Sequence, residues 1–446
     1  MREMKKGPSE SNRPVTSLCD GRRAMTSTLL SALIFLVALN LRPAIAAVGP
    51  VLIRIGADLG WGESVLGILG AMPLWAFAAV SPLVRFVTAR IGADRTILMA
   101  LLVLAAGDVI RSFGGSTGVW LGTVAVGAGI AAGNVLVPVI AKRDYARHVS
   151  MATGVYSACI TTGSAVAGLT AAPLADALGG WRPALAIWAV PPVIVAALWM
   201  IRVMKAAVQK RNSVPVSGSV PESASSLPSA ANHTPSRITV AVTEQSDGKE
   251  VTDGGESLRR RPMTWYVTLF MGLQSAAFYT MSNWLPSVAV AAGYSDAAAG
   301  VHLFVFQSLG IVSGLMIPAL MYVRDNQICA AMTASVPMVI AGLGWMFAPG
   351  CSLIWSVIGG AGQGAALVVA LTLISLRGRT ASETVALSGM AQSLGYLLAS
   401  IGPLAFGTLA EISDGWTAPL ALFTMLAAAQ CVIAVFAGRV IPERRQ

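Results

Sequence analysis

Arg42 is the residue of this sequence with the clearest capacity for chemistry, because it lies within an apolar stretch. Residues 38–52 read "ALNLRPAIAAVGPVL". An arginine in such surroundings is costly and usually faces a cavity or a partner, and its planar guanidinium can hold a small anion or polarised group. Pro43 follows and should break one backbone hydrogen bond, which would kink the helix beside the site. We predict that Arg42 binds a ligand; a structural arginine paired with carbonyls is the alternative.

Side-chain amides lie at comparable depth in other apolar stretches. Gln274 and Gln363 each lie about 11 residues into theirs, roughly 16 Å along a helix at 1.5 Å per residue. Asn40 lies in the first stretch and Asn134 in the fourth. These amides predict a polar lining around the arginine. Hydrogen bonding between helices is the alternative role, and Asn40 and Gln307 are the weaker candidates for ligand binding.

Tyr279 and Trp284 are aromatic residues that could bracket a flat heteroaromatic ring. Gln274 and Tyr279 are five residues apart, which is about 140° around a regular helix. We therefore expect both to face one cavity only if this helix is distorted. Packing or anchoring at an interface is the commoner role of such aromatic residues.

Asp108 and Arg111 form a charged pair inside another apolar stretch. Their spacing of three residues suits an intrahelical ion pair. One possibility is that Asp108 takes up and releases a proton as the protein changes conformation, and so couples ion movement to function. A structural pair at the end of its helix is the favoured interpretation.

The elements that carry these residues are twelve stretches, each long enough to cross a bilayer as a helix of about 20 apolar residues. The 446-residue chain is 55% hydrophobic and only 12% charged, about half the charge of a typical soluble protein. This composition excludes a soluble multidomain enzyme and predicts an all-α membrane protein. The stretches lie near residues 27–52, 64–84, 96–115, 117–140, 150–173, 184–203, 263–290, 297–322, 328–348, 351–375, 385–410 and 417–440.

Two sets of six stretches define the expected domains. We predict a disordered basic tail over 1–26, helical bundles over 27–203 and 263–440, a flexible Ser-, Pro- and Thr-rich linker over 204–262, and a short tail over 441–446. Most Lys and Arg residues fall in the tails, the linker and the loops of one side. This bias places both termini in the cytoplasm and predicts a multi-pass inner (plasma) membrane protein. It also explains the net charge of +10 without nucleic acid.

Internal repetition supports duplicated halves. Residues 171–188 and 401–423 both contain Pro-Leu-Ala, then a short polar loop that ends in Gly-Trp, and then an apolar helix. Stretches four and ten each carry a close-packing glycine pair at GxxxG spacing. Duplicated halves of this kind are typical of several transporter folds. The glycine pairs are Gly129 with Gly133 and Gly360 with Gly364.

Three motifs give the sequence a resemblance to the major facilitator superfamily, and more closely to its cyanate/nitroimidazole permease (CynX/NimT) family. They are Asn-Leu-Arg-Pro within 38–52, "AAGNVLVPVIAKRDY" (131–145) and "LFMGLQSAAFYTMSNWLPSVA" (269–289). The resemblance implies twelve transmembrane helices in two pseudo-repeats. It also implies a central cavity lined by spans 1, 4, 7 and 10, which carry the arginine and the amides named above.

The loop after the second stretch departs in part from the pattern of the superfamily. Arg90, Gly92 and Arg95 match its cytoplasmic gate loop, whereas Ala89 replaces the usual acidic residue. Thr123 stands where an arginine often linked to proton coupling is expected. These departures argue against a standard proton antiport mechanism.

The function implied is secondary transport of a small polar or anionic compound, such as a cyanate-like anion or a nitro-heterocycle, by alternating access between two halves. A multidrug or organic-acid efflux carrier of the same superfamily is the alternative, and a membrane receptor or sensor is the alternative from another class. The chain carries no Walker-type motif, GxSxG or HExxH. We therefore expect no enzyme activity, no cofactor or metal, no nucleic-acid partner, and function as a monomer in the bilayer.

Overall fold

The computed structural model describes residues 30–146, 148–212, 260–322, 327–378 and 381–439. The predicted tails over 1–26 and 441–446 lie outside the described residues, as does most of the predicted linker. The described part of the chain is helical throughout, with short 3₁₀ segments and no strand.

The first half contains six spans, and the first of them is interrupted. The second to sixth spans are α4, α5, α6, α7 and the run α8–η2–α9. The elements are helical residues 30–39, α2 (Pro43–Ala46), η1 (Gly49–Val51), α3 (Leu52–Leu59), α4 (Glu63–Ile91), α5 (Ala93–Phe113), α6 (Gly115–Asp144), α7 (Val149–Ala177), α8 (Trp181–Ala186), η2 (Ile187–Ala189) and α9 (Val190–Asn212).

The second half repeats the six spans. Its elements are α11 (Pro262–Ala291), α12 (Asp296–Met316) with η3 (Ile317–Tyr322), α13 (Ile328–Phe347), η4 (Pro349–Cys351), α14 (Ser352–Arg377), α15 (Ala381–Ser413) and α16 (Thr417–Gly438).

The twelve predicted spans are therefore present among the described residues. Eleven are long and apolar enough to cross a membrane by length and composition alone. The other, α11, is equally long but carries more polar residues, and most of its side chains are buried inside the protein. Several helices also run past the predicted ends, such as α4, which continues to Ile91 beyond the apolar stretch that was predicted to end at residue 84. Charged residues after that stretch remain helical because nothing obliges a helix to end at the membrane surface.

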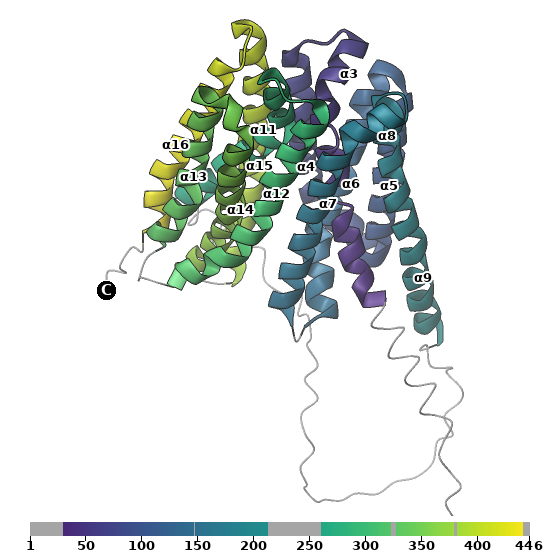
Figure 1. Cartoon of the computed structure of the whole chain (residues 1–446). Coiled ribbons are helices and arrows are strands. Elements are labelled where there is room, and N and C mark those ends of the chain that lie inside the picture. Colours follow the sequence, from purple (N-terminus) through teal and green to yellow (C-terminus); the bar gives the residue numbers. More distant parts are fainter. Residues whose placement is uncertain (1–29, 147, 213–259, 323–326, 379–380, 440–446) are drawn as a thin grey trace, which may run out of the picture.

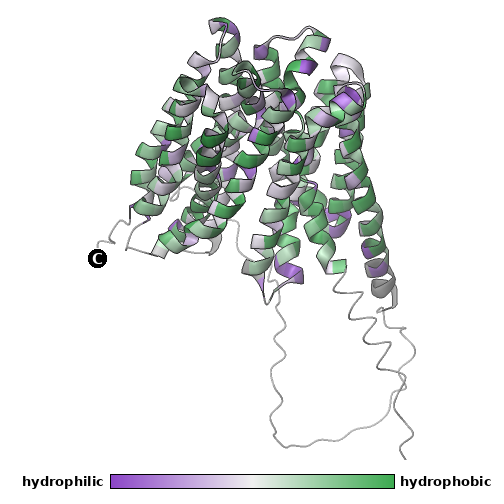
Figure 2. Ribbon diagram, viewed as in Figure 1, coloured by the Kyte–Doolittle hydropathy of each residue, from purple (hydrophilic) through white to green (hydrophobic). Residues whose placement is uncertain are grey.

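The two halves touch at one end of the molecule and diverge at the other (Figure 1). Helix α4 packs against α15, and α7 packs against α12, which are pseudo-equivalent contacts of the duplicated halves. The end of α9 and the start of α11, between which most of the predicted linker lies, are both at the divergent end. We call this end the linker end and the opposite end the closed end. Hydrophobic residues cover the outside of the spans, whereas hydrophilic ones gather towards the helix ends (Figure 2).

The predicted glycine pairs lie at close helix contacts. A Cβ atom on Gly129 would lie 2.8 Å from the Ala100 carbonyl oxygen of α5, and one on Gly364 would lie 1.9 Å from the Gly310 carbonyl oxygen of α12. Helices α6 and α14 therefore approach their neighbours more closely than a larger side chain would allow. This contact confirms the expected packing in both halves.

Candidate functional site

A cavity of about 500 Å³ lies between the two halves. Its wall contains Arg42 from the first span, together with residues of α7, α11, α12, α14 and α15. It extends to Thr153 and Ser375, which lie near the linker ends of α7 and α14. The cavity thus belongs to both halves and runs from the centre of the protein towards the linker end.

The first span is broken at Arg42, as Pro43 predicts. The Asn40 and Leu41 N–H groups bond to the Val37 and Ala38 carbonyls at 3.0 and 3.1 Å, three residues back instead of four. Arg42 itself adopts φ −127° and ψ −25° just before α2 begins. The break places a half-buried arginine side chain against the cavity instead of inside a regular helix.

The guanidinium of Arg42 lies among aromatic rings. Its central carbon is 5.5 Å from the ring centre of Phe278 and 5.2 Å from that of Tyr279, both on α11. Tyr396 of α15 also lines the cavity. The ion pairs found among the described residues all belong to other arginines. Arg42 therefore gives the cavity a positive charge that aromatic faces, but no described carboxylate, balance.

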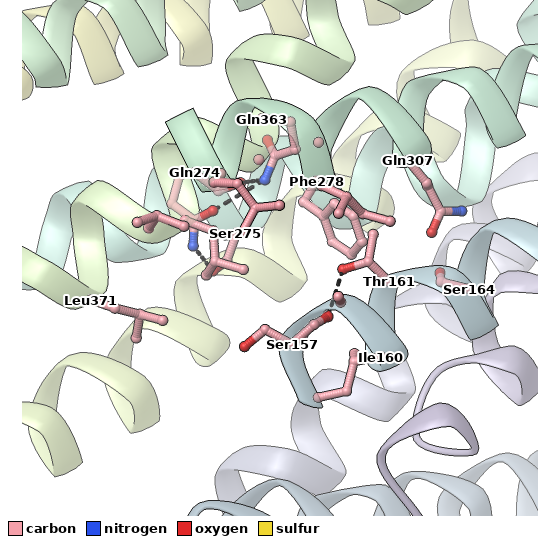
Figure 3. Close-up of a pocket in the computed structure, with 18 of the residues that line it drawn as sticks. Ser157, Ile160, Thr161, Ser164, Gln274, Ser275, Phe278, Gln307, Gln363 and Leu371 are labelled. Carbon is pink, nitrogen blue, oxygen red and sulfur yellow. Dashed lines mark hydrogen bonds between the residues drawn. The ribbon is translucent and has the colours of Figure 1, made fainter. Parts of the chain in front are cut away.

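Gln274 and Gln363 meet directly across α11 and α14 (Figure 3). The Gln363 Nε2 group donates to Gln274 Oε1 at 3.1 Å and to the Gln274 backbone carbonyl at 3.3 Å. Gln274 Nε2 donates to the Ser275 hydroxyl at 2.7 Å. The pair therefore forms a hydrogen bond between two spans of the second half and also lies in the cavity wall.

Gln307 and a polar face of α7 complete the cavity wall (Figure 3). Gln307 is only 2% exposed, and neither of its amide atoms has a hydrogen-bond partner among the described residues. Ser157, Thr161 and Ser164 lie on α7 and also line the cavity. Sequence reasoning did not single out these hydroxyl residues. Their spacing of three and four residues along one helix face was the available signal.

Three predicted ligand residues lie outside this cavity lining. The Asn40 side chain donates to the Leu36 carbonyl at 2.8 Å, within its own helical segment. Asn134 is half-buried on α6. Trp284 is fully buried near the closed end, where its indole N–H donates to the Pro403 carbonyl at 3.0 Å. Among the described residues, the structure thus gathers Arg42, Gln274, Tyr279 and Gln363 but not the other three.

Gln274 and Tyr279 both line the cavity although no break interrupts their helix, so a distortion is not required for this. Helix α11 is continuous from Pro262 to Ala291, yet both side chains line the cavity. The reason is that the cavity wraps around α11 and also touches Ser275 and Phe278, so one helix presents two faces to it.

Asp108 and Arg111 form a buried ion pair, with Arg111 Nη2 2.6 Å from Asp108 Oδ1. Their side chains are 0% and 3% exposed, and neither residue is part of the cavity lining. Arg111 Nη1 also donates to the Ala44 carbonyl of α2 at 2.7 Å. The pair therefore connects α5 to the broken segment that carries Arg42.

The predicted gate loop lies at the linker end, between α4 and α5. Gly92 has φ +85°, which a residue with a side chain rarely adopts, and it allows the direct turn between the two helices. Arg90 and Arg95 are exposed. Asp94 beside them accepts hydrogen bonds from Arg143 at 2.8 and 3.1 Å and from Arg202 at 2.8 Å. This network ties α5, α6 and α9 together within the first half.

Polar contacts also join the two halves at the closed end. Arg54 Nη1 pairs with Asp176 of α7 at 2.6 Å, and Arg54 Nε donates to Asp296 Oδ2 of α12 at 2.9 Å. The Ser64 backbone N–H at the start of α4 donates to Glu411 of α15 at 2.7 Å. An arginine with two carboxylates thus links the halves beside the α7–α12 contact, and a hydrogen bond to a carboxylate links them at the α4–α15 contact.

Twelve spans in two halves around a central cavity, whose wall holds an arginine and several amides, define a membrane transporter. The sequence profile of the Major Facilitator Superfamily matches residues 28–403, and the chain belongs to that superfamily. It is 32% identical over 412 residues to a 2-nitroimidazole transporter of Escherichia coli K12, covering 92% of this chain and 95% of the relative. It is 22% identical over 387 residues to the cyanate transport protein CynX of the same organism, covering 85% and 90%.

A solved structure has the same fold. The crystal structure of a bacterial homologue of the human lysosomal transporter Spinster, in an inward-facing and unoccupied conformation, matches with a TM-score of 0.69 at 15% identity. The match covers 92% of this chain and 96% of that one. The chain is thus a multi-pass membrane transporter of a small molecule and not an enzyme, as the sequence indicated.

Proposed function

We propose that the substrate is a small, planar, polar compound such as a nitro-heterocycle, and that Arg42 holds the partially negative oxygens of its nitro group. The guanidinium of Arg42, which lies between two aromatic rings and forms no ion pair with a described carboxylate, carries this proposal. The guanidinium can donate paired hydrogen bonds to nitro or carboxylate oxygens, while aromatic faces stack on a flat ring. The relative named for 2-nitroimidazole is also more similar to this chain than the one named for cyanate.

A cavity of this size fits a ring better than a triatomic anion. The cavity has a volume of about 500 Å³ and a mostly apolar wall. This volume lies within the range of sites that enclose small organic ligands. Cyanate would leave most of this volume unfilled. We therefore place cyanate transport behind transport of a nitro-heterocycle.

Alternating access supplies the proposed mechanism. We propose that the linker end faces the cytoplasm of a cell whose inner membrane holds the protein, so the described conformation is inward-facing. Its match to an inward-facing neighbour and its basic loops at that end support this orientation. Rocking of the halves would then close the linker end near Arg90, Gly92 and Arg95, and open the closed end. One chain encloses the whole cavity, which supports function as a monomer.

Binding and uptake measurements on one variant pair test the proposal. We expect 2-nitroimidazole to raise the thermal stability of the purified protein, and to change in cellular accumulation when the protein is produced. Arg42→Ala should abolish both effects at unchanged abundance in the membrane. Arg85→Ala is the matched control, because Arg85 lies 4.5 Å from the Phe86 ring outside the cavity lining. Normal binding by Arg42→Ala would exclude the assigned role.

A further inference from the structure

The break in the first span leaves backbone carbonyls without their usual partners. Pro43 has no N–H, so the Leu39 carbonyl lacks the donor that a continuous helix would supply. The Val48 N–H donates to the Ile45 carbonyl at 3.1 Å, so it does not donate to the Ala44 carbonyl four residues back. Buried carbonyls of this kind need other partners, and those partners decide where the segment sits.

Two other helices contact these two carbonyls, one before and one after Arg42. The contact from α5 is a hydrogen bond, and the contact from α7 is close packing. Arg111 Nη1 of α5 donates to the Ala44 carbonyl at 2.7 Å. Gly163 of α7 packs so closely against the Leu39 carbonyl that a Cβ atom there would lie 2.1 Å from its oxygen. The residues before and after Arg42 are therefore each fixed by a different neighbouring helix.

Asp108 determines how Arg111 reaches this carbonyl. Its Oδ1 accepts from Arg111 Nη2 at 2.6 Å, which leaves Nη1 directed at Ala44. A buried ion pair often contributes less stability than well-packed apolar side chains would, so stability alone does not account for this pair. The hydrogen bond to the broken segment gives the pair a further role.

We propose that Asp108 and Arg111 act as positioning residues for Arg42, aided by the close contact at Gly163. The pair holds the α2 segment so that the Arg42 guanidinium stays against the cavity, beside Phe278 and Tyr279. This inference rests on the proposed function, in which Arg42 binds the substrate. It replaces proton transfer at Asp108 as the reason for a buried charge in α5, since the pair does not line the cavity.

A paired replacement separates positioning from bulk stability. Asp108→Leu with Arg111→Met removes the pair without leaving a lone buried charge. We expect the melting temperature of the purified protein to stay close to that of the wild type. Its affinity for 2-nitroimidazole should fall about tenfold, as for the loss of one charge-assisted hydrogen bond. The single variant Arg111→Lys keeps Asp108 and a donor near the Ala44 carbonyl. Its affinity should therefore be close to that of the wild type and higher than that of the paired replacement.

Gly163→Ala tests the same idea from α7 without touching the ion pair. The added methyl group should displace the Leu39 carbonyl and lower the affinity by a similar factor. Gly389→Ala is the control, because no atom lies within 4 Å of the Cβ position there. Should the paired replacement fail to fold, the Gly163→Ala result decides.

The remaining outcomes are also decisive. Wild-type affinity in both the paired replacement and Gly163→Ala would overturn the positioning role. The paired replacement could instead keep its affinity for 2-nitroimidazole while its transport no longer responds to an imposed pH gradient. That result would assign Asp108 to proton coupling. Binding of 2-nitroimidazole by Arg42→Ala at wild-type strength, or no binding by the wild type, would refute the proposed function itself and the positioning role with it.

Discussion

Gln307 is a buried amide whose position in the cavity wall should lower the stability of the protein. Its amide is buried at the cavity wall, with no partner among the described residues. A buried amide without hydrogen bonds costs about 1–3 kcal/mol. We expect Gln307→Leu to raise the melting temperature and to weaken 2-nitroimidazole binding, measured by thermal shift with and without the compound. Gln430→Leu is the control, because Gln430 is equally buried but donates to Ser335 away from the cavity. A lower melting temperature for Gln307→Leu would contradict this prediction.

At the residue scale, the sequence predicted depth better than direction. Arg42, Gln274 and Gln363 were placed near the centre from their position in apolar stretches, and they meet at one cavity. Trp284 was a candidate to bracket a flat ring, but it lies near the closed end and outside the cavity lining. Which side of a helix faces the cavity depends on packing with other spans, which a single sequence does not contain. The hydroxyl residues of α7 were missed because Ser and Thr are common in membrane helices and signal little alone.

At the element scale, the glycines of the second half make their closest approach to a neighbouring helix between α12 and α14. A Cβ atom on Gly364 would lie 1.9 Å from the Gly310 carbonyl oxygen, so Gly364→Ala requires the two helices to move apart. Such overpacking typically costs about 1–3 kcal/mol. We expect a lower melting temperature for the purified variant. Gly389→Ala should keep or raise it, because alanine fits there and favours the helix. Equal melting temperatures for both variants would contradict the prediction.

The spans themselves could be predicted from the sequence because hydrophobic length alone defines them. The GxxxG pairs and the break at Pro43 were also readable, since each follows from local geometry. The contact of two faces of α11 with the cavity was not, because residues of both halves form that cavity. Arg111 offers a similar case: its spacing from Asp108 predicted the pair, whereas its bond to Ala44 depends on a distant break in another span.

At the scale of the whole molecule, the closed end must separate if the halves rock. Arg54 links α3 to Asp296 of α12 there, and both side chains are about one-third exposed. A partly exposed ion pair contributes at most about 1 kcal/mol and weakens with salt. Arg54→Ala should therefore shift the population towards opening at this end by about two- to fivefold. The shift is modest because the Ser64–Glu411 contact and the helix packing remain.

Labelling of a buried seam residue measures this opening. Leu303 is fully buried and packs near Gly168 of α7, so Leu303→Cys reacts with a hydrophilic maleimide only when α7 and α12 separate. In a background without the natural cysteines, Arg54→Ala should raise the labelling rate two- to fivefold. Arg182→Ala should not, because Arg182 pairs with Asp58 inside the first half at 2.7 Å. High salt should accelerate labelling with Arg54 present and have little effect without it. Equal rates with and without Arg54 would show that helix packing alone holds the closed end together.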